Sequence, residues 1–386
     1  MTAVTPARAA ITLVFFLNGA LFGAWAARIP AVQGRLGLGE GELAVALAFL
    51  AVGSLMAMPL AGRWAARAGS RRATRGLFLA FCAAVAVVTL APSLPALCVG
   101  TFLVGASGGG LDVVMNAQGT TVERHSGRLV LSSLHAAFSA GGLAGAGIAA
   151  LAAAGGVDVR VQLAGAAMIA AAAGLLATRH LLASETDAAP EGPSFARPDR
   201  GLWALGFVAF CSLLGEGAAA DWSAVYLSAS LGATPAVAAL AFAGFSATMV
   251  GGRLLGDRLV ARLGAATTLR AAGAIAALGL GAGLAIGTPA GALTGFALLG
   301  AGLSVIIPLV FRAASVRGAT SSGPPLAAVA TMGYFGILAG PPLVGALAEL
   351  TSLTFALGVV ALLVATPIAL ARPAAPSPEG AVTVEA

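Results

Sequence analysis

A single carboxylate ends a long uncharged part of the chain, and an amide follows it at helical spacing. The sequence from Gly76 to Leu111 contains no Asp, Glu, Lys or Arg, and Asp112 comes directly after it. Gly108, Asp112 and Asn116 recur every four residues, so a helix would carry them on one face. A carboxylate that can exchange a proton, beside an amide that can bind polar groups, is suited to proton transfer and ligand binding.

His135 is a second proton-exchanging group near this stretch. Asp112 precedes the predicted turn between two helices, which lies near 119–128, by seven residues, and His135 follows it by seven. In an antiparallel helix pair these spacings predict similar depths, and an imidazole beside a protonatable carboxylate can couple proton movement to a ligand. The alternatives are that Asp112 only pairs helices and that His135 is a packed histidine bonded to a backbone carbonyl.

The composition places the chain in lipid. Only 9% of the 386 residues are charged and 59% are hydrophobic, whereas a soluble domain carries about 25% charged residues. We therefore expect a multi-pass membrane protein. The 21 basic residues are all arginines in short clusters between apolar segments, which argues against a nucleic-acid-binding face. The three cysteines have no C-x-x-C spacing, so we expect buried free thiols, with no metal and no cofactor.

Twelve segments are long and apolar enough to cross a membrane, for which a helix needs about 20 residues. We therefore expect an all-α membrane protein with 12 transmembrane helices. The predicted spans are 10–29, 42–62, 76–93, 95–117, 129–152, 161–179, 201–227, 236–256, 270–287, 290–311, 325–347 and 353–371.

The distribution of arginine predicts the orientation. Arginines concentrate in every second connection between the predicted spans, and only Arg28, Arg35 and Arg160 lie on the other side. Because positively charged residues stay in the cytoplasm, both termini are expected there, in a bacterial inner membrane. An alternative treats the first span as a signal peptide cleaved after "AWA" (24–26), which would leave eleven spans.

The two halves of the chain repeat each other. "ALAF" occurs at 46–49 and again at 239–242. Basic segments that share A-R-x-G follow at 62–69 and 257–264. This spacing, together with the alternating connections, predicts an internal duplication into two parallel six-helix halves.

Two parallel halves are the layout of the major facilitator superfamily, and the chain resembles that superfamily in its first basic loop as well. The pseudo-symmetric bundles are expected at 1–179 and 201–386, the second with a short cytoplasmic tail, joined by a polar cytoplasmic linker at 180–200. The loop resembles the signature Gly-x-x-x-Asp-Arg-x-Gly-Arg-Arg, with Ala66 in place of Asp. The matching residues, which the resemblance implies act in conformational change, are Gly62, Arg67, Gly69, Arg71 and Arg72.

"LDVVMN" and "GRLVLSSLHAAFSAGG" resemble the fucose permease branch of the superfamily, and "FFL" (15–17) and "PAVQ" (30–33) fit its first span. Asp112 matches the carboxylate that this branch uses in proton-coupled sugar symport, Asn116 matches its amide, and His135 falls at its span-five Gln. Ala26 stands where the branch has a second carboxylate.

The predicted seventh span holds another polar cluster, "GEGAAADWSAVYL". Similar permeases carry Glu, Trp and Tyr in this span, so Glu216 is expected to line the cavity. Arg28 ends the first span at the same outer level, and we hypothesise that it closes an outer gate with Asp221 or Glu216. The competing interpretations are a plain interfacial arginine and, for Trp222 and Tyr226, an aromatic belt at the membrane surface.

Three more residues are candidate cavity groups. Asn18 and Trp25 lie in the first predicted span, and Tyr334 lies in the eleventh. The eleventh span also contains "GYFGILAGPP" (333–342), whose Gly and Pro residues can bend a helix.

These features predict a secondary active transporter that moves a small polar solute, sugar-like by resemblance, together with protons by alternating access. Expected partners are the solute, protons and the lipid bilayer, with no nucleic acid, and we expect a monomer. An exporter of amphipathic compounds and a non-transporting membrane sensor are the rival functions. We do not expect an enzyme or an ATP-driven pump, because neither H-E-x-x-H nor G-x-x-x-x-G-K-[ST] occurs.

Overall fold

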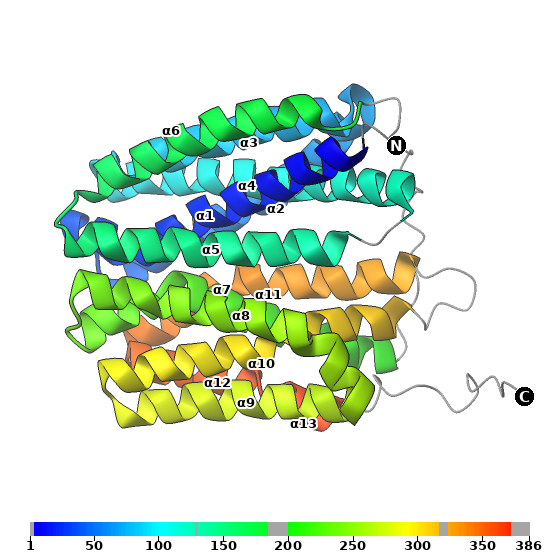
Figure 1. Ribbon diagram of the computed structural model, residues 1–386. Helices are drawn as coiled ribbons and strands as arrows, with labels where there is room; N and C mark the ends of the chain where they lie inside the picture. The colour runs from blue at the N-terminus through cyan, green and yellow to red at the C-terminus, as the bar shows by residue number, and fades with distance from the viewer. Residues whose placement is uncertain (1–3, 128–129, 184–199, 316–322, 372–386) are drawn as a thin grey trace, which may run out of the picture.

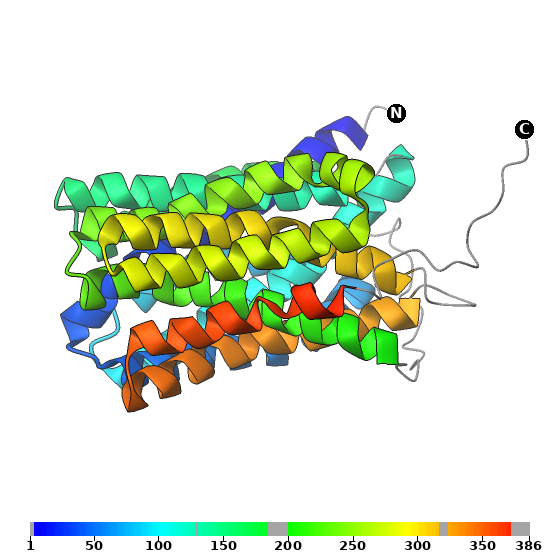
Figure 2. The same cartoon turned by 90° about the horizontal axis from the view of Figure 1, so that it is seen from below.

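The computed structural model describes residues 4–127, 130–183, 200–315 and 323–371, which form a bundle of long helices (Figure 1, Figure 2). Within these ranges the backbone contains helices and turns and no strand. Short helical turns lie at Thr178–His180 and Tyr226–Ser230. The α-helices are α1 (Val4–Leu36), α2 (Glu40–Ala68), α3 (Ser70–Val88), α4 (Leu94–Ser126), α5 (Leu131–Ala154), α6 (Val159–Ala177), α7 (Arg200–Val225), α8 (Pro235–Leu263), α9 (Ala265–Ile286), α10 (Pro289–Ser315), α11 (Gly323–Leu350), α12 (Leu353–Leu363) and α13 (Thr366–Leu370).

Eleven helices in the described part of the chain are long and apolar enough to cross a membrane, with α12 and α13 counted as one. The long helix outside this count is α3, which has 19 residues and carries Arg71, Arg72 and Arg75 near its start. The rest of α3 is apolar and packs against α4 and α6. With α3, the described ranges contain the twelve spans expected from the sequence, and the predicted all-α membrane fold is confirmed.

The start of α1 and the end of α13 lie at the same end of the bundle (Figure 1). This end also holds the turns at Gly69, Gly127 and Gly264, and we call it the arginine-rich end. The turns at 155–158 and 231–234 lie at the opposite end.

The fourth helix is longer than its predicted span of 95–117, because it continues to Ser126. Gly127 ends the helix in the left-handed conformation, with φ 64° and its N–H donating to the Glu123 carbonyl at 2.9 Å. The Glu123 carboxylate in turn accepts from the N–H groups of Val130 at 2.6 Å and Leu131 at 2.9 Å. These bonds satisfy the backbone where α5 begins, so the polar end of α4 is stable as helix.

A single glycine separates two helices at equivalent places in both halves. Gly69 (φ 87°) joins α2 to α3 and donates to the Ala65 carbonyl at 2.8 Å. Gly264 (φ 78°) joins α8 to α9 and donates to the Val260 carbonyl at 2.9 Å. A side chain is strained at such φ values, so glycine is required at both turns.

The other residues of the first basic motif surround the Gly69 turn. Gly62 lies within α2, and Arg67 and Arg72 are exposed. Arg71 donates to the Arg179 carbonyl at 2.7 Å, which ties the start of α3 to the short helical turn after α6.

Close helix contacts set the positions of α1, α4 and α5. A Cβ built on Gly141 of α5 would collide with the Phe16 carbonyl oxygen of α1, and one on Gly105 of α4 would collide with the Leu50 carbonyl oxygen of α2. Small residues permit such approaches between membrane helices. The Thr101 hydroxyl also donates across from α4 to α2, at 2.7 Å from the Ala46 carbonyl.

The first six helices meet the last six mainly through α5 with α8 and α2 with α11. At the opposite end, the Gly41 N–H of α2 donates to the Glu349 carboxylate of α11 at 3.0 Å. Helix α11 remains helical through Pro341 and Pro342, the residues expected to allow a bend.

The three cysteines are free and buried, as the sequence predicts. Cys82 lies on α3, Cys98 on α4 and Cys211 on α7, with exposed fractions of 3%, 6% and 0%.

Candidate functional site

Asp112 joins the two halves of the protein. Its Oδ2 accepts a hydrogen bond from the Tyr334 hydroxyl of α11 at 3.1 Å, across 222 residues of sequence. Its Oδ1 accepts from the Asn116 amide at 3.1 Å, which also donates to the Asp112 carbonyl at 2.8 Å. The predicted helical pair is therefore formed, and Tyr334 supplies a second donor from the other half.

His135 extends this network through Asn116. Its Nε2 lies 3.2 Å from Asn116 Oδ1, and its ring meets the Phe15 ring edge-on with centroids 5.5 Å apart. Because α4 runs to Ser126, the turn lies farther along the chain than the predicted 119–128, which changes the residue of α4 that faces His135. His135 contacts Asn116, which lies one helical turn closer to the arginine-rich end than Asp112.

Arg253 of α8 is a site residue that the sequence reasoning missed. Its Nη1 donates to Ser139 Oγ at 2.5 Å and to the His135 carbonyl at 3.4 Å, so it contacts α5 in the other half. Its Nη2 lies 4.0 Å from Glu216 Oε1 of α7. Arg253 was grouped with the arginines of the adjacent basic loop because it lies close to that loop. However, it falls inside the predicted span 236–256, where a charged residue indicates function.

Asn18 and Trp25 are buried in α1, at 5% and 3% exposed. The Asn18 amide points to Met115 Sδ at 3.6 Å, so it lies beside the helical turn that carries Asn116. The Trp25 indole Nε1 has no hydrogen-bond partner among the described residues. Trp25 lies two helical turns farther toward the opposite end than Asn18.

The outer gate that we predicted is not formed by its predicted residues. Arg28 donates to the Val157 carbonyl at 2.7 Å, within its own half. Within the described ranges, Arg28 forms no ion pair with Asp221 or Glu216. The cause is the reach of each side chain, since Arg28 extends to the α5–α6 turn and Glu216 faces Arg253.

The aromatic-belt interpretation of the seventh span is wrong. Trp222 is 0% and Tyr226 is 1% exposed. Both side chains are buried inside the protein, whereas belt residues contact the membrane surface.

A G-x-S-x-G pattern at 105–109, which the sequence reasoning overlooked, has no nucleophile geometry. It lies inside α4, and the Ser107 hydroxyl donates to the Leu103 carbonyl at 2.6 Å. A hydrolase nucleophile of this pattern stands on a strand-to-helix turn with its hydroxyl exposed.

The network brings polar and titratable side chains of both halves together. Asp112, Asn116 and His135 come from the first six helices, and Tyr334, Arg253 and Glu216 come from the last six. His135 is exposed and Tyr334 is 38% exposed. Each half thus contributes an exposed polar side chain to the network.

Comparison with known proteins identifies the family. The profile of the Major Facilitator Superfamily matches residues 11–323. The chain belongs to this superfamily. An MFS-type transporter of Yersinia pestis is 34% identical over 360 residues, which cover 93% of this chain and 94% of that protein. A transporter of Sinorhizobium fredii is 36% identical over 357 residues, 91% of this chain and 94% of that protein.

Solved structures confirm the superfamily fold of this transporter. The nucleoside transporter NupG has a TM-score of 0.73 at 13% identity, covering 94% of this chain and 98% of NupG. A point variant of the E. coli fucose:proton symporter FucP has a TM-score of 0.63 at 17% identity, covering 98% of this chain and 100% of FucP. The resemblance to the fucose permease branch thus extends to the fold, and the protein is a multi-pass membrane transporter.

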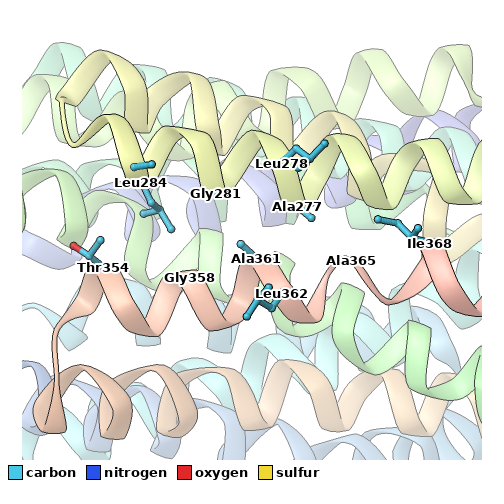
Figure 3. Close-up of a pocket in the computed structure, with 11 residues that line it drawn as sticks. Ala277, Leu278, Gly281, Leu284, Thr354, Gly358, Ala361, Leu362, Ala365 and Ile368 are labelled. Atoms are coloured by element: carbon cyan, nitrogen blue, oxygen red, sulfur yellow. The ribbon is translucent and has the colours of Figure 1, made fainter.

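The transporter also has an apolar groove of about 430 Å³ away from the network (Figure 3). It lies between α9 and the α12–α13 pair and is lined by small and aliphatic residues such as Gly281, Gly358 and Ala361. It contains none of the polar side chains that surround Asp112.

Proposed function

We propose that this transporter carries a small polar solute with protons across the bacterial inner membrane by alternating access. The observation that carries the proposal is the hydrogen bond between Asp112 and Tyr334, which links α4 and α11 inside the membrane. A carboxylate in a spanning helix is costly and usually marks a transport or proton pathway.

In this proposal, Asp112 is the coupling carboxylate. Asn116 and Tyr334 hold it with two donors, and His135 reaches the solvent-accessible side of the network. A solute hydroxyl that donates to the Asp112 carboxylate competes with the Tyr334 hydroxyl for Oδ2. Solute and proton binding then loosen the contact between the halves 1–179 and 201–386, which rock about the site while the linker 180–200 joins them.

The orientation follows from charge. The arginine-rich end is cytoplasmic because basic residues remain on that side of the membrane. Both termini are then cytoplasmic, and residues that close the opposite end control access from the periplasm.

A sugar-like solute is the favoured substrate class. Asp112 and Asn116 match the motif of the fucose permease branch, and the names of FucP and NupG describe transport of fucose and of nucleosides, which both carry sugar hydroxyls. Amide, carboxylate and phenol groups suit hydroxyl recognition, because they offer donors and acceptors in one place.

The test is uptake of labelled sugars and other small polar solutes into proteoliposomes, with and without an inward proton gradient. We expect gradient-driven uptake in the wild type and loss of gradient dependence in Asp112→Asn. Asp158→Asn is the matched control, since Asp158 is a carboxylate between α5 and α6 that pairs with Arg160 at 3.0 Å. Gradient-driven uptake that survives Asp112→Asn would remove Asp112 from the coupling site, and absence of flux for every solute would contradict the proposal.

A further inference from the structure

Arg253 is a cation within a membrane-spanning helix, where a charged side chain is costly and usually functional. It lies ten residues before Leu263, the last residue of α8, which is about 15 Å along the helix. Its side chain is 21% exposed, so the guanidinium is accessible in part.

Several N–H donors of the Arg253 guanidinium form no hydrogen bond to the described residues. A guanidinium has five N–H donors. Arg253 uses Nη1 on two neutral acceptors, the Ser139 hydroxyl and the His135 carbonyl. Its carboxylate neighbour Glu216 lies at 4.0 Å, which is too long for a hydrogen bond.

We propose that Arg253 binds a carboxylate group of the transported solute, and that Glu216 is the internal competitor that faces Arg253 when no solute carboxylate is bound. A planar guanidinium binds a carboxylate through two parallel hydrogen bonds, which is stronger than the loose pair with Glu216. This inference rests on the proposed function and narrows its substrate class to hydroxylated carboxylates, such as sugar acids.

The contacts place Arg253 next to the hydroxyl-binding groups. His135 touches Arg253 through its carbonyl and Asn116 through its Nε2. Asn116 in turn bonds Asp112. A solute with a carboxylate at one end and hydroxyl groups at the other can thus bind Arg253 and Asp112 together.

Charge balance links this subsite to proton coupling. This part of the network contains two carboxylates, Asp112 and Glu216, and one guanidinium, that of Arg253, which faces Glu216. A solute anion adds a third negative charge, which is unfavourable inside a membrane unless a proton enters with it. An anionic solute therefore gives the transporter a physical reason to take up protons.

The test compares acidic and neutral probes of the same shape. The shift of the thermal unfolding midpoint of the purified full-length protein is measured against D-galacturonate and D-galactose, and against D-gluconate and sorbitol. We expect each acid to bind at least tenfold more tightly than its neutral partner. We expect Arg253→Gln to abolish this preference, Arg253→Lys to keep part of it, and Glu216→Gln to tighten binding of the acid severalfold.

Arg312→Gln is the matched control, because Arg312 is an exposed arginine in the last turn of α10. It should bind the acids as the wild type does. Equal binding of acid and neutral partner, no shift with either acid, or a preference that survives Arg253→Gln would overturn the inference.

The binding assay has no membrane and no gradient, so it separates the two proposals. Acid binding at Arg253 without gradient-driven uptake would contradict the proposed transport and keep the anion subsite. Gradient-driven uptake of a neutral solute that is unchanged in Arg253→Gln would support the proposed transport and contradict the anion subsite.

Discussion

Tyr334 is one of only two tyrosines in the chain, which makes its hydroxyl easy to test. Tyr334→Phe removes the donor to Asp112 and leaves the ring in place. A hydrogen bond to a charged group contributes about 1.5–3 kcal/mol, so we expect proton-driven uptake to fall by about tenfold or more. Tyr226→Phe is the control, because it removes the other phenol hydroxyl, outside the Asp112 network. Equal losses in both variants would show that the effect is not specific to the network.

Asp158 provides a prediction about pH. It lies outside the spans, and hydrogen bonds from the Arg160 guanidinium and backbone lower its pKa to about 2. A lowered pKa in the folded state means that the stabilisation is present above the unfolded value of about 3.9 and is lost as the pH falls toward 2. The difference in unfolding midpoint between wild type and Asp158→Asn should be constant from pH 5 to 8 and shrink below pH 4. A difference that changes between pH 5 and 8 would contradict this assignment.

Local spacing predicted part of the network and could not predict the rest. Asp112 and Asn116 are one helical turn apart, so the sequence itself brings them together. Tyr334 was expected in the cavity, but its bond to Asp112 crosses 222 residues and depends on how α4 and α11 pack. Arg253 was missed because it lies three residues from the predicted end of its span and was grouped with a loop.

At the level of helices, α1 and α5 are held at close range by glycine. Gly141→Ala would place a methyl group against the Phe16 carbonyl oxygen, whereas Gly147→Ala, on the same helix, meets nothing within 4 Å. Overpacking costs about 1–3 kcal/mol, while an open helical position gains up to about 1 kcal/mol from alanine. We expect a lower unfolding midpoint for Gly141→Ala and an equal or higher one for Gly147→Ala. Similar midpoints would mean that α1 and α5 can separate slightly at no cost.

Hydrophobicity predicted the helices well and their ends poorly. Apolar length locates a span, but the polar segment at 118–126 remains helical because Gly127 and Glu123 satisfy the backbone at the turn. Conversely, the three arginines of α3 lower its hydropathy as a candidate span. The helix is nevertheless held in the bundle by its apolar residues, which pack against α4 and α6. Capping and packing decide these boundaries, and hydropathy does not report them.

For the whole molecule, the hydrogen bond between Glu349 and α2 joins the two halves at the opposite end and predicts how that end opens. The Glu349 carboxylate accepts from Gly41 at the N-terminus of α2, where the helix dipole favours a negative charge. We expect Glu349→Ala to shift the transporter toward opening at this end. Spin labels at Val45 on α2 and Leu350 on α11, both exposed, should then give a longer mean distance.

Glu42→Ala is the control for this distance measurement. Glu42 has the same charge as Glu349, but it accepts a hydrogen bond from the Gly39 N–H at the start of its own helix, at 3.1 Å. Within the described residues, no hydrogen bond or ion pair joins Glu42 to the other half. The label distance should stay at its wild-type value in Glu42→Ala. An unchanged distance in Glu349→Ala would show that other contacts close this end.

Because all three cysteines are buried, thiol labelling of the unmodified chain can report when each region unfolds. A thiol-reactive dye has almost no surface to attack on Cys82, Cys98 or Cys211 while the helices are packed. Dye incorporation therefore measures opening, and mass spectrometry of the modified peptides reports which region opens first. Reaction at Cys211 before Cys82 and Cys98 would mean that α7 loosens ahead of α3 and α4, so the order of labelling separates the melting of one half from that of the other.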